Sequence, residues 1–393
     1  METARTMRLV IAASEFPPAP GGIGTHAYQL AKHLEEAGAD VTVVARQDYA
    51  KEEEIAAFNA MQSFAVKRMR SLPTAPVKAL DRLLFLATQM RRVRADIVLA
   101  SGMRVSWMTA LLAARYHLPW VAVGHGTEFA FAQHWARALS RLAYSRASVV
   151  VCVSHFTQAQ MGALGVRTVR SVVIHNGADA RQFQPLEPRV VEAFRRGRGW
   201  HNSRLILTVG RVSERKGQDV VIRALPSILR EYPDTHYLIA GLPDNKAAFL
   251  TLACQLGVDE HVHFLGRVTE EEVVLLQNCC DLFVMTSKRT ASGDLEGYGI
   301  AVVEAALCGK AAVVSADSGL VEAIEPGRTG LAVPQNDEAA TAEAILTLLR
   351  DDALRQRMGQ AARSRALHSQ TWAHCAAQYD ALLKELVEDK GAR

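Results

Sequence analysis

The chain has 393 residues, of which 49% are hydrophobic and 22% are charged, and this balance excludes a disordered or fibrous protein. Its length suits two domains of ordinary size, each able to bury its own core. The net charge of +4 is unevenly distributed, because residues 1–199 carry 25 Lys and Arg against 15 Asp and Glu, whereas residues 200–393 carry 20 against 26.

The sequence predicts a cytoplasmic protein. No apolar run is long enough to cross a membrane, and the apolar run near the start is a short strand rather than a signal-peptide core. The six cysteines include no Cys-x-x-Cys pair and no His spacing completes a zinc site, so we expect free thiols and no metal site. No nucleic-acid partner is expected, and the oligomeric state is left open.

Much of the positive charge lies between Lys67 and Arg94, where eight Lys and Arg residues accompany a single acid, Asp81. A basic, partly amphipathic segment of this kind predicts peripheral association with an anionic membrane surface, here at the inner face of the membrane. A solvated helix face and a binding site for a phosphorylated acceptor are the alternatives.

The first half of the chain alternates strands with helices, the order that produces a parallel sheet covered by helices. Residues 47–75 show no regular pattern. Strands are expected at 8–13, 41–45, 97–100, 119–123, 148–153 and 172–175, and helices at 26–37, 79–93, 105–115, 130–145 and from His155 onward.

A loop rich in Pro and Gly, residues 15–25, separates the first strand from the first helix. Ligands of α/β sheets bind at such strand ends. Gly21 and Gly22 would let the backbone approach a ligand closely. The glycine spacing differs from a dinucleotide fingerprint, and a plain tight turn is the alternative.

A histidine stands at the end of the strand expected at 119–123. His125 lies between two glycines, so its side chain is expected to point out of the strand end rather than into the core. A core histidine is the alternative. Glu128, three residues later, is a candidate acceptor-side base or hydrogen-bond acceptor.

The second half repeats the alternation. Arg211 and Lys216 follow its first strand in a loop framed by Gly210 and Gly217, and two cations at a strand end suit a diphosphate. A solvated basic turn is the alternative. Strands are expected at 204–209, 237–241, 262–265, 282–286 and 311–315, and helices at 218–230, 249–256, 270–278, 300–307, 339–350, 352–365 and from Thr371 onward.

The chain is organised around residues 294–315, in which Glu296 and Glu304 are eight positions apart with Gly297 and Gly299 between them. This pattern predicts a loop that opens a helix, where free N–H groups favour an anion. Two acids on either side of a bound phosphate suit the hydroxyl groups of a nucleotide sugar. An ordinary helix start, with acids favoured by the helix dipole, is the alternative.

This stretch resembles the Glu-x7-Glu motif of the retaining GT-B glycosyltransferases of family four. The likeness covers roughly residues 8–385 and rests on four motifs in order: Gly21 with Gly22, His125, Arg211 with Lys216, and Glu296 with Glu304. It implies an α/β protein of the GT-B fold, with two Rossmann-like doubly wound parallel-sheet domains facing a central cleft. The N-terminal, acceptor-binding domain would span 1–185, the donor-binding domain 200–370, and the last helix, 371–390, would pack back on the first domain.

The resemblance also implies an enzyme that moves a hexose, with retention, from GDP-mannose or a UDP-hexose to a hydroxyl of a glycan, glycolipid or lipid-linked acceptor. No cofactor and no metal are expected. Catalytic roles are carried over to His125, Glu296, Arg211 and Lys216. Donor contacts are carried over to Gly21, Gly22, Gly210, Arg267, Val268, Gly297, Tyr298, Gly299, Ile300 and Glu304.

Two stretches depart from the family pattern. Leu320 and Val321 stand where relatives often have other residues. Many relatives also carry a histidine in the tail of the strand expected at 97–100, where this chain has Leu99-Ala100-Ser101-Gly102, so an acceptor role of such a histidine is absent. A nucleotide-sugar epimerase of the same fold and a non-catalytic nucleotide-sugar-binding protein are the alternative functions. A phosphorylase is disfavoured because its pyridoxal lysine motif is not found in the sequence.

Overall fold

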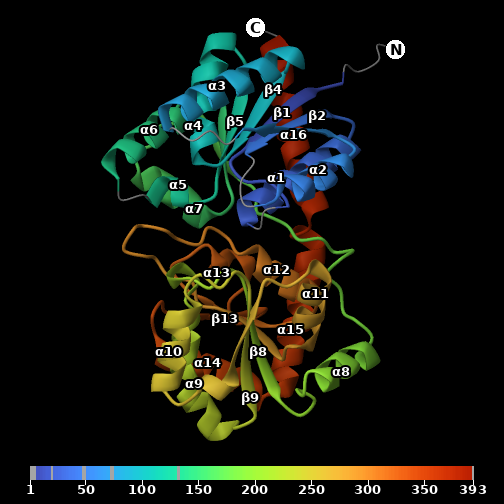
Figure 1. Ribbon diagram of the computed structural model, residues 1–393, viewed down its shortest axis with the longest axis vertical. Helices are drawn as coiled ribbons and strands as arrows, with labels where there is room; N and C mark the ends of the chain where they lie inside the picture. Colours follow the sequence, from blue (N-terminus) through green and yellow to red (C-terminus); the bar gives the residue numbers. More distant parts are fainter. Residues whose placement is uncertain (1–5, 19–20, 47–49, 71–74, 131–132, 392–393) are drawn as a thin grey trace. The chain divides into compact units, whose positions relative to one another are not determined.

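The computed structural model of the protein describes residues 6–18, 21–46, 50–70, 75–130 and 133–391 (Figure 1). The chain forms two compact units. Unit 1 comprises Met1–Asn176 together with Trp372–Arg393, and unit 2 comprises Gly177–Thr371. Each unit has its own parallel sheet and its own hydrophobic core.

Unit 1 contains a sheet with the strand order β3-β2-β1-β4-β5-β6-β7. Its strands are β1 (Arg8–Ala13), β2 (Asp40–Arg46), β3 (Ala65–Met69), β4 (Ile97–Ser101), β5 (Trp120–Gly124), β6 (Val149–Cys152) and β7 (Ser171–Val173). Its helices are α1 (Gly22–Glu36), α2 (Glu52–Ala60), α3 (Ala75–Arg92), α4 (Met103–Tyr116), α5 (Thr127–Ala130), α6 (His134–Tyr144), α7 (His155–Ala163) and α16 (Trp372–Gly391).

Unit 2 contains a sheet with the strand order β10-β9-β8-β11-β12-β13. Its strands are β8 (Arg204–Val209), β9 (Thr235–Ala240), β10 (Val262–Gly266), β11 (Leu282–Met285), β12 (Ala312–Ser315) and β13 (Gly330–Val333). Its helices are α8 (Pro188–Gly197), α9 (Gln218–Glu231), α10 (Lys246–Gln255), α11 (Glu270–Cys279), α12 (Ile300–Leu307), α13 (Leu320–Ala323), α14 (Glu338–Arg350) and α15 (Asp352–Ser369), with short 3-10 turns at Glu214–Lys216 and Asp259–His261.

Both sheets are doubly wound, and this fixes where polar groups can gather. The central strands are buried along nearly their whole length, so helices must cover both faces. In unit 1 the winding reverses between β1 and β4, and in unit 2 it reverses between β8 and β11. The loops that follow these strands diverge there, which leaves room for a ligand at the carboxyl ends of the strands.

Two predictions of local structure were wrong. Residues 47–75 were expected to be irregular, but the described part of this segment forms α2 and the edge strand β3. β3 pairs with β2 through main-chain bonds and exposes part of its side chains, so it lacks an apolar run that would reveal it in the sequence. The first helix begins at Gly22 rather than His26, because the carbonyl of Gly21 already accepts the amide of Thr25 at 2.9 Å.

The thiols are free, as predicted; five are buried and Cys254 is exposed. Among the described residues, no helix combines the length and the apolar character that crossing a bilayer requires.

The C-terminal helix α16 belongs to unit 1, where it packs against α1. Tyr379 on α16 is fully buried, and its hydroxyl lies 3.2 Å from Nε2 of the equally buried His26 on α1. His26 also contacts the ring of Trp372, with 6.0 Å between ring centroids. These contacts fix the start of α1, which carries Gly22.

We predict that Tyr379→Phe lowers the free energy of unfolding by about 1–2 kcal/mol, because Nε2 of His26 loses its partner in a buried site. Urea denaturation measures the loss. The control is Lys384→Ala on the same helix, which removes an exposed ion pair to Asp380 and should cost less than about 0.5 kcal/mol. Equal losses in the two variants would show that the buried bond contributes nothing particular.

Candidate active site

The first cluster of predicted site residues lies at the carboxyl ends of β1, β4 and β5 in unit 1. We call Gly21, Ser101, His125, Glu128 and His26 the His125 cluster. Nε2 of His125 lies 2.9 Å from the hydroxyl oxygen of Ser101, the last residue of β4. The imidazole therefore leans from β5 toward the point where the winding reverses, as expected of a ligand-facing residue.

The groups around His125 keep it neutral. Burial lowers the pKa of His125 to about 4. The ring of His26 lies edge-on to it, with 5.0 Å between centroids, and burial followed by the nearness of His125 lowers the pKa of His26 as well. A neutral His125 can donate from one ring nitrogen and accept at the other, and the Ser101 hydroxyl can partner Nε2 in either tautomer.

Glu128 is buried directly below the turn that carries His125. Its carboxylate accepts the main-chain amide of His125 at 3.1 Å, so it holds the turn in shape. Burial raises the pKa of Glu128 to about 7, although main-chain N–H groups act in the opposite direction. Among the described residues, its other oxygen has no hydrogen-bond partner. Through this hydrogen bond, the buried Glu128 holds the main chain of His125 in place.

Gly21 and Gly22 begin α1 beside β1. The backbone of Gly21 has a φ of 156°, a conformation that favours glycine, and a Cβ there would lie 2.4 Å from a carboxylate oxygen of Glu15. A side chain at this position would therefore displace the turn that starts α1.

The second cluster lies at the carboxyl ends of β8 and β11 in unit 2. We call Arg215, Lys216, Asp294 and Glu296 the Glu296 cluster. The Lys216 ammonium lies 2.7 Å from the Glu296 carboxylate, and the Arg215 guanidinium lies 2.5 Å from the same oxygen. Arg215 also pairs with Asp294 at 3.1 Å. The loops after the two strands are thus joined by charge where the winding of the sheet reverses.

The ion pairs determine the charge states. Burial alone would raise the pKa of Glu296, but Arg215 and Lys216 lower it to about 2. Burial lowers the pKa of Lys216, while the Glu296 carboxylate opposes that effect. Glu296 is therefore a carboxylate at neutral pH, and two cations stand beside it.

Helix α12 starts immediately after the Glu296 loop. Its N-cap, Gly299, has a φ of 96°, and a Cβ there would lie 2.3 Å from the side chain of Leu320. The first turn of α12 leaves main-chain N–H groups available for an anion, and Ile300 is its first residue. Glu304, one turn later, is partly exposed; burial and the charge of Glu270 raise its pKa to about 7, against the effect of Lys216.

Of the other predicted residues of unit 2, Gly210 adjoins this cluster, whereas Arg211, Arg267 and Val268 are not part of it. Arg211 pairs with Asp244 at 3.0 Å rather than with Glu296, and its side chain is 49% exposed. Gly210 lies beside Lys216, because a Cβ on it would meet the lysine side chain at 3.3 Å. Arg267 and Val268 follow β10, two strands from β8.

Tyr298 differs from its predicted donor-binding neighbours. Its side chain is buried and its hydroxyl accepts the side-chain amide of Gln370 at 2.8 Å, so only its main chain faces the loop. Gly297 lies next to it, and the main-chain amide of Gly319 donates to the carbonyl of Glu296 at 3.0 Å.

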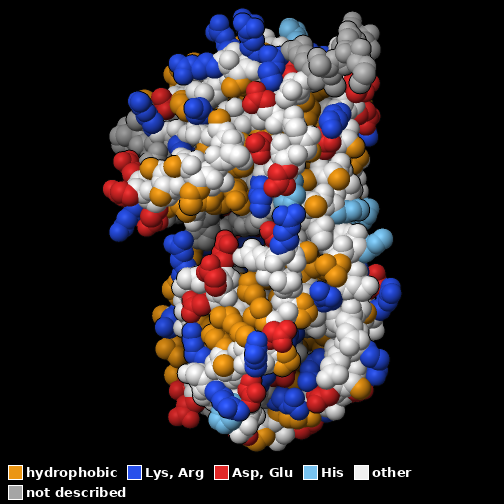
Figure 2. All heavy atoms as spheres, turned by 90° about the vertical axis from the view of Figure 1, so that its right-hand side faces the viewer, with side chains coloured by type: hydrophobic (Ala, Val, Ile, Leu, Met, Phe, Trp, Pro, Cys, Tyr) orange, Lys and Arg blue, Asp and Glu red, His pale blue; other side chains and the backbone are white. Residues whose placement is uncertain are grey.

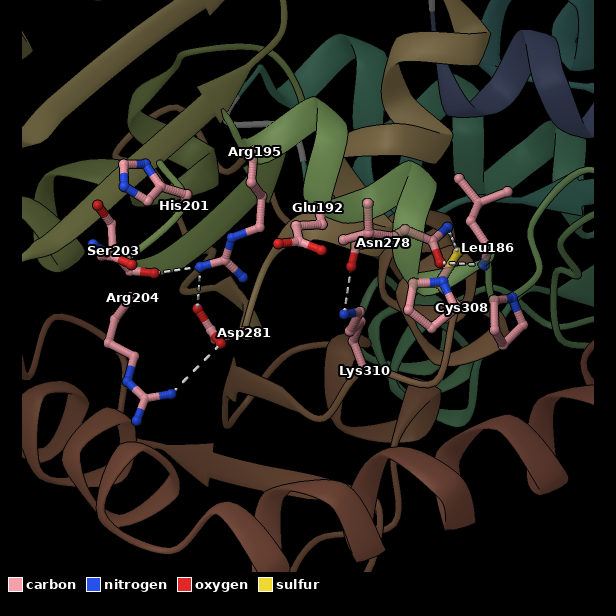
Figure 3. A pocket seen from close by; sticks show the side chains of 14 residues that line it. Leu186, Glu192, Arg195, His201, Ser203, Arg204, Asn278, Asp281, Cys308 and Lys310 are labelled. Carbon is pink, nitrogen blue, oxygen red and sulfur yellow. Dashed lines mark hydrogen bonds and ion pairs between the residues drawn. The ribbon is translucent and has the colours of Figure 1, made fainter. Parts of the chain in front are cut away.

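A cavity of about 670 Å³ lies at the opposite edge of the same sheet, between α8 and the residues just before β8, β11 and β12 (Figure 3). The charged side chains that line this cavity are already paired with other groups of the protein. Arg195 donates to the carbonyl of Cys279 at 3.1 Å and pairs with Asp281 at 3.5 Å. Lys310 donates to the carbonyls of Asn278 and Cys280 at 2.7 and 2.8 Å. We therefore assign the site to the carboxyl edge.

Sequence reasoning missed Arg215, Asp294, Ser101 and His26. Arg215 directly precedes Lys216, and Asp294 lies two residues before Glu296, so both stood inside motifs already singled out. Nothing in the sequence indicated which of the neighbouring cations would reach Glu296. The contact of His26 with His125 arises from the packing of α1 beside β5.

We predict that Arg215→Gln lowers the free energy of unfolding at pH 7 by about 2 kcal/mol, because Asp294 and the largely buried Glu296 each lose an ion pair. Because the pKa of Glu296 is lowered in the folded state, its contribution is present above about pH 4.5 and is lost as the pH falls toward 2. The variant should lose less stability over that range. Denaturation of Arg215→Gln and of the exposed control Arg223→Gln over this pH range measures both effects; an equal acid response would refute the pairing.

The comparisons with known proteins agree with this geometry. Two family models match the chain: Glycosyltransferase Family 4 over residues 20–182, and Glycosyl transferases group 1 over residues 190–365. The matched regions contain the His125 cluster and the Glu296 cluster respectively.

Relatives and solved structures extend the match. A GDP-mannose-dependent alpha-(1-6)-phosphatidylinositol monomannoside mannosyltransferase of Mycolicibacterium smegmatis is 32% identical over 64% of the chain and 66% of its own length. A glycogen synthase of Mycobacterium tuberculosis is 29% identical over 93% of the chain and 92% of its own length. The crystal structure of Anabaena Alr3699/HepE in complex with UDP and glucose matches with a TM-score of 0.83 and 22% identity, over 96% of this chain and 99% of that one.

The two matched families, the doubly wound parallel sheets and the charged residues at their switch points lead to one conclusion: the chain belongs to the group 1 glycosyltransferases of family four and has the GT-B fold.

Proposed function

We propose that this glycosyltransferase moves a hexose from a nucleoside diphosphate sugar, GDP-mannose or a UDP-hexose, to a hydroxyl of a glycan, glycolipid or lipid-linked acceptor, with retention of configuration. The observation that carries the proposal is the Glu296 cluster, in which a carboxylate and two cations stand beside the N-terminus of α12. The name of the GDP-mannose-dependent relative supports the first donor class, and the UDP and glucose in the Alr3699/HepE complex support the second.

In this proposal the cations act on the leaving group. Negative charge grows on the departing diphosphate, and Lys216, Arg211 and the main-chain N–H groups of α12 stabilise it. Lys216 must exchange its contact with Glu296 for one with the phosphate, whereas Arg215 keeps Glu296 ionised and oriented through Asp294. These groups supply the positive charge that a metal ion provides in other transferases.

The remaining groups bind the donor. Glu296 accepts hydroxyls of the transferred sugar, and Glu304 accepts the hydroxyls of the ribose. His125 hydrogen-bonds the sugar through the ring nitrogen that Ser101 leaves free. Gly21 and Gly22 let the start of α1 approach the donor. No covalent nucleophile is assigned; the acceptor proton passes to the leaving oxygen as the new bond forms on the same face.

A nucleotide thermal-shift titration tests the donor site. We expect UDP or GDP to raise the midpoint of thermal unfolding by a few degrees when present at about a hundred times its dissociation constant, which adds about 2.7 kcal/mol. Lys216→Ala should abolish the shift, and the exposed control Arg230→Ala should retain it. Failure of UDP, GDP, ADP and dTDP to shift the wild type would refute the diphosphate site.

Transfer assays then separate the proposal from its alternatives. The wild type should transfer sugar from UDP-glucose or GDP-mannose, and NMR of the product should show the anomeric configuration of the donor. Glu296→Ala and His125→Ala should lose transfer. An epimerase would instead convert the free nucleotide sugar, and a sensor would bind it without turnover.

The raised pKa of Glu304 predicts that donor binding strengthens with pH. The carboxylate is a better acceptor for ribose hydroxyls than the protonated acid, and the pKa of about 7 places this change near neutrality. Affinity for the nucleotide sugar should rise roughly tenfold from about pH 6 to about pH 8. Calorimetric titration measures it. Glu304→Gln, which does not titrate, should show a flat profile; an unchanged slope in that variant would contradict the assigned role.

A further inference from the structure

Unit 1 has an outer surface, formed by helices on one face of its sheet, that contributes no residue to the proposed transfer reaction. Crossovers between parallel strands are right-handed, so the helices after β3, β4 and β5 cover the same face of the sheet. We call the outward sides of α3, α4 and α6 the outer helical surface. The inward sides of these helices share a single hydrophobic cluster, which includes Leu86, Ala110 and Ala143.

The outer helical surface exposes an unusual number of large apolar side chains. Of the twelve large hydrophobic residues that are exposed in the described part of the chain, seven lie on these three helices, and they are between 43% and 61% exposed. On α3 and α6 they follow helical spacing, so each of these two helices presents a stripe, and α4 adds one exposed leucine. The seven are Val77, Leu80 and Leu84 on α3, Leu111 on α4, and Trp135, Leu139 and Leu142 on α6.

Side-chain contacts connect the exposed sides of α4 and α6. The indole N–H of Trp107 on α4 donates to the hydroxyl of Ser140 on α6 at 3.2 Å. The ring of Trp107 also contacts that of the exposed Trp135, with 5.9 Å between centroids. The two helices therefore form a stable platform, and exposed apolar patches of this kind usually mark a binding surface.

Positive charge surrounds the apolar stripes. Residues 75–170 contain twelve Lys and Arg and only three acids. Of these acids, Glu128 is buried and Asp96 pairs with Arg8 at 2.7 Å. Arg104 and Arg115 share the outward side of α4 with Leu111, and Arg137 and Arg141 are exposed on α6.

Figure 2 shows the side of unit 1 that lies to the right in Figure 1, away from α4 and α6, and there Lys and Arg side chains gather at the upper end of the unit. The basic segment 67–94 is not itself one continuous surface. Arg68 on β3 is partly buried and donates to the side chain of Asn59 at 2.8 Å, and Arg82 on α3 is buried.

We propose that the outer helical surface binds an anionic lipid bilayer, with the apolar stripes in the interface and the arginines on the lipid headgroups. A tryptophan and leucines suit the apolar boundary of the bilayer, and the flanking arginines suit its anionic headgroups. A nucleic acid would be satisfied by the charges but would leave the leucines exposed to water, and a neutral protein partner would leave the arginines without anions.

The surface also lies where a lipid-linked acceptor would need to arrive. Helices that follow parallel strands begin at the carboxyl edge of the sheet, and α6 begins nine residues after His125. The exposed Trp135 is the second residue of α6, so the apolar stripe starts on the edge that carries the His125 cluster. This last step depends on the proposed function, whereas bilayer binding does not.

Vesicle co-sedimentation of the full chain tests the proposal. We expect binding to phosphatidylcholine vesicles that contain about one third phosphatidylglycerol, little binding to pure phosphatidylcholine, and weakening with salt. Arg137→Gln with Arg141→Gln should weaken binding about fivefold per residue. Trp135→Glu with Leu139→Glu should weaken it at least tenfold, because charges enter the apolar interface.

The matched control places the same charges on exposed leucines of unit 2, as Leu250→Glu with Leu367→Glu, and should bind like the wild type. Circular dichroism and the unfolding midpoint establish that each variant is folded. Absent binding by the folded wild type, or equal loss in the control, would overturn the proposal. A dimer in solution that Leu139→Glu dissociates would instead identify this surface as a contact between copies of the chain.

The nucleotide thermal shift keeps the two hypotheses apart. If the surface proposal fails and the proposed function holds, the vesicle variants and the wild type still respond to UDP or GDP but do not bind vesicles. If the proposed function fails, vesicle binding persists without any nucleotide response.

Discussion

The loops at the carboxyl edge of the unit 2 sheet depend on one carboxylate that stays ionised although it is largely shielded from water. The Glu296 side chain is only 12% exposed, and isolating its charge there would be costly. Arg215 and Lys216 remove that cost, and in doing so they join the loop after β8 to the loop after β11. The same contact also neutralises the cations until an anion competes for them. Under the proposed function, a site whose charges balance at rest would bind a diphosphate without recruiting new residues.

The parallel sheets account for how much the sequence reveals. Strands buried on both faces appear as continuous apolar runs, so β1, β8 and β12 could be located from composition alone, and the helices between them followed from their periodicity. Because ligands gather at strand ends, His125 could be singled out directly after such a run, and Lys216 and Glu296 in the loops that follow two others. The resemblance to family four was carried by these same positions, and the family matches and the GT-B fold confirm it.

What the sequence could not reveal depends on tertiary contacts. Arg211 was predicted as a site residue and Arg215, in the same loop, was not. Only Arg215 reaches Glu296, because Arg211 pairs with Asp244. Tyr298 lies between two predicted site glycines, but its side chain is buried and its hydroxyl accepts a hydrogen bond from Gln370. The edge strand β3 exists because β2 offers it a partner, not because its own residues form an apolar run. In each case a neighbour distant in sequence decides the outcome.

The chain order of unit 1 has a consequence for how the protein is made. Its sheet is complete by β7, but α16, which packs against α1 in the same unit, follows the whole of unit 2 in the chain. A ribosome must therefore synthesise the whole of unit 2 before His26 and Trp372 can meet. During that interval the nascent N-terminal unit exposes the surface that α16 later covers, and a prematurely terminated chain never covers it. The folding of unit 1 is therefore tied to the synthesis of unit 2, because the buried contact between α1 and α16 forms only after both have been made.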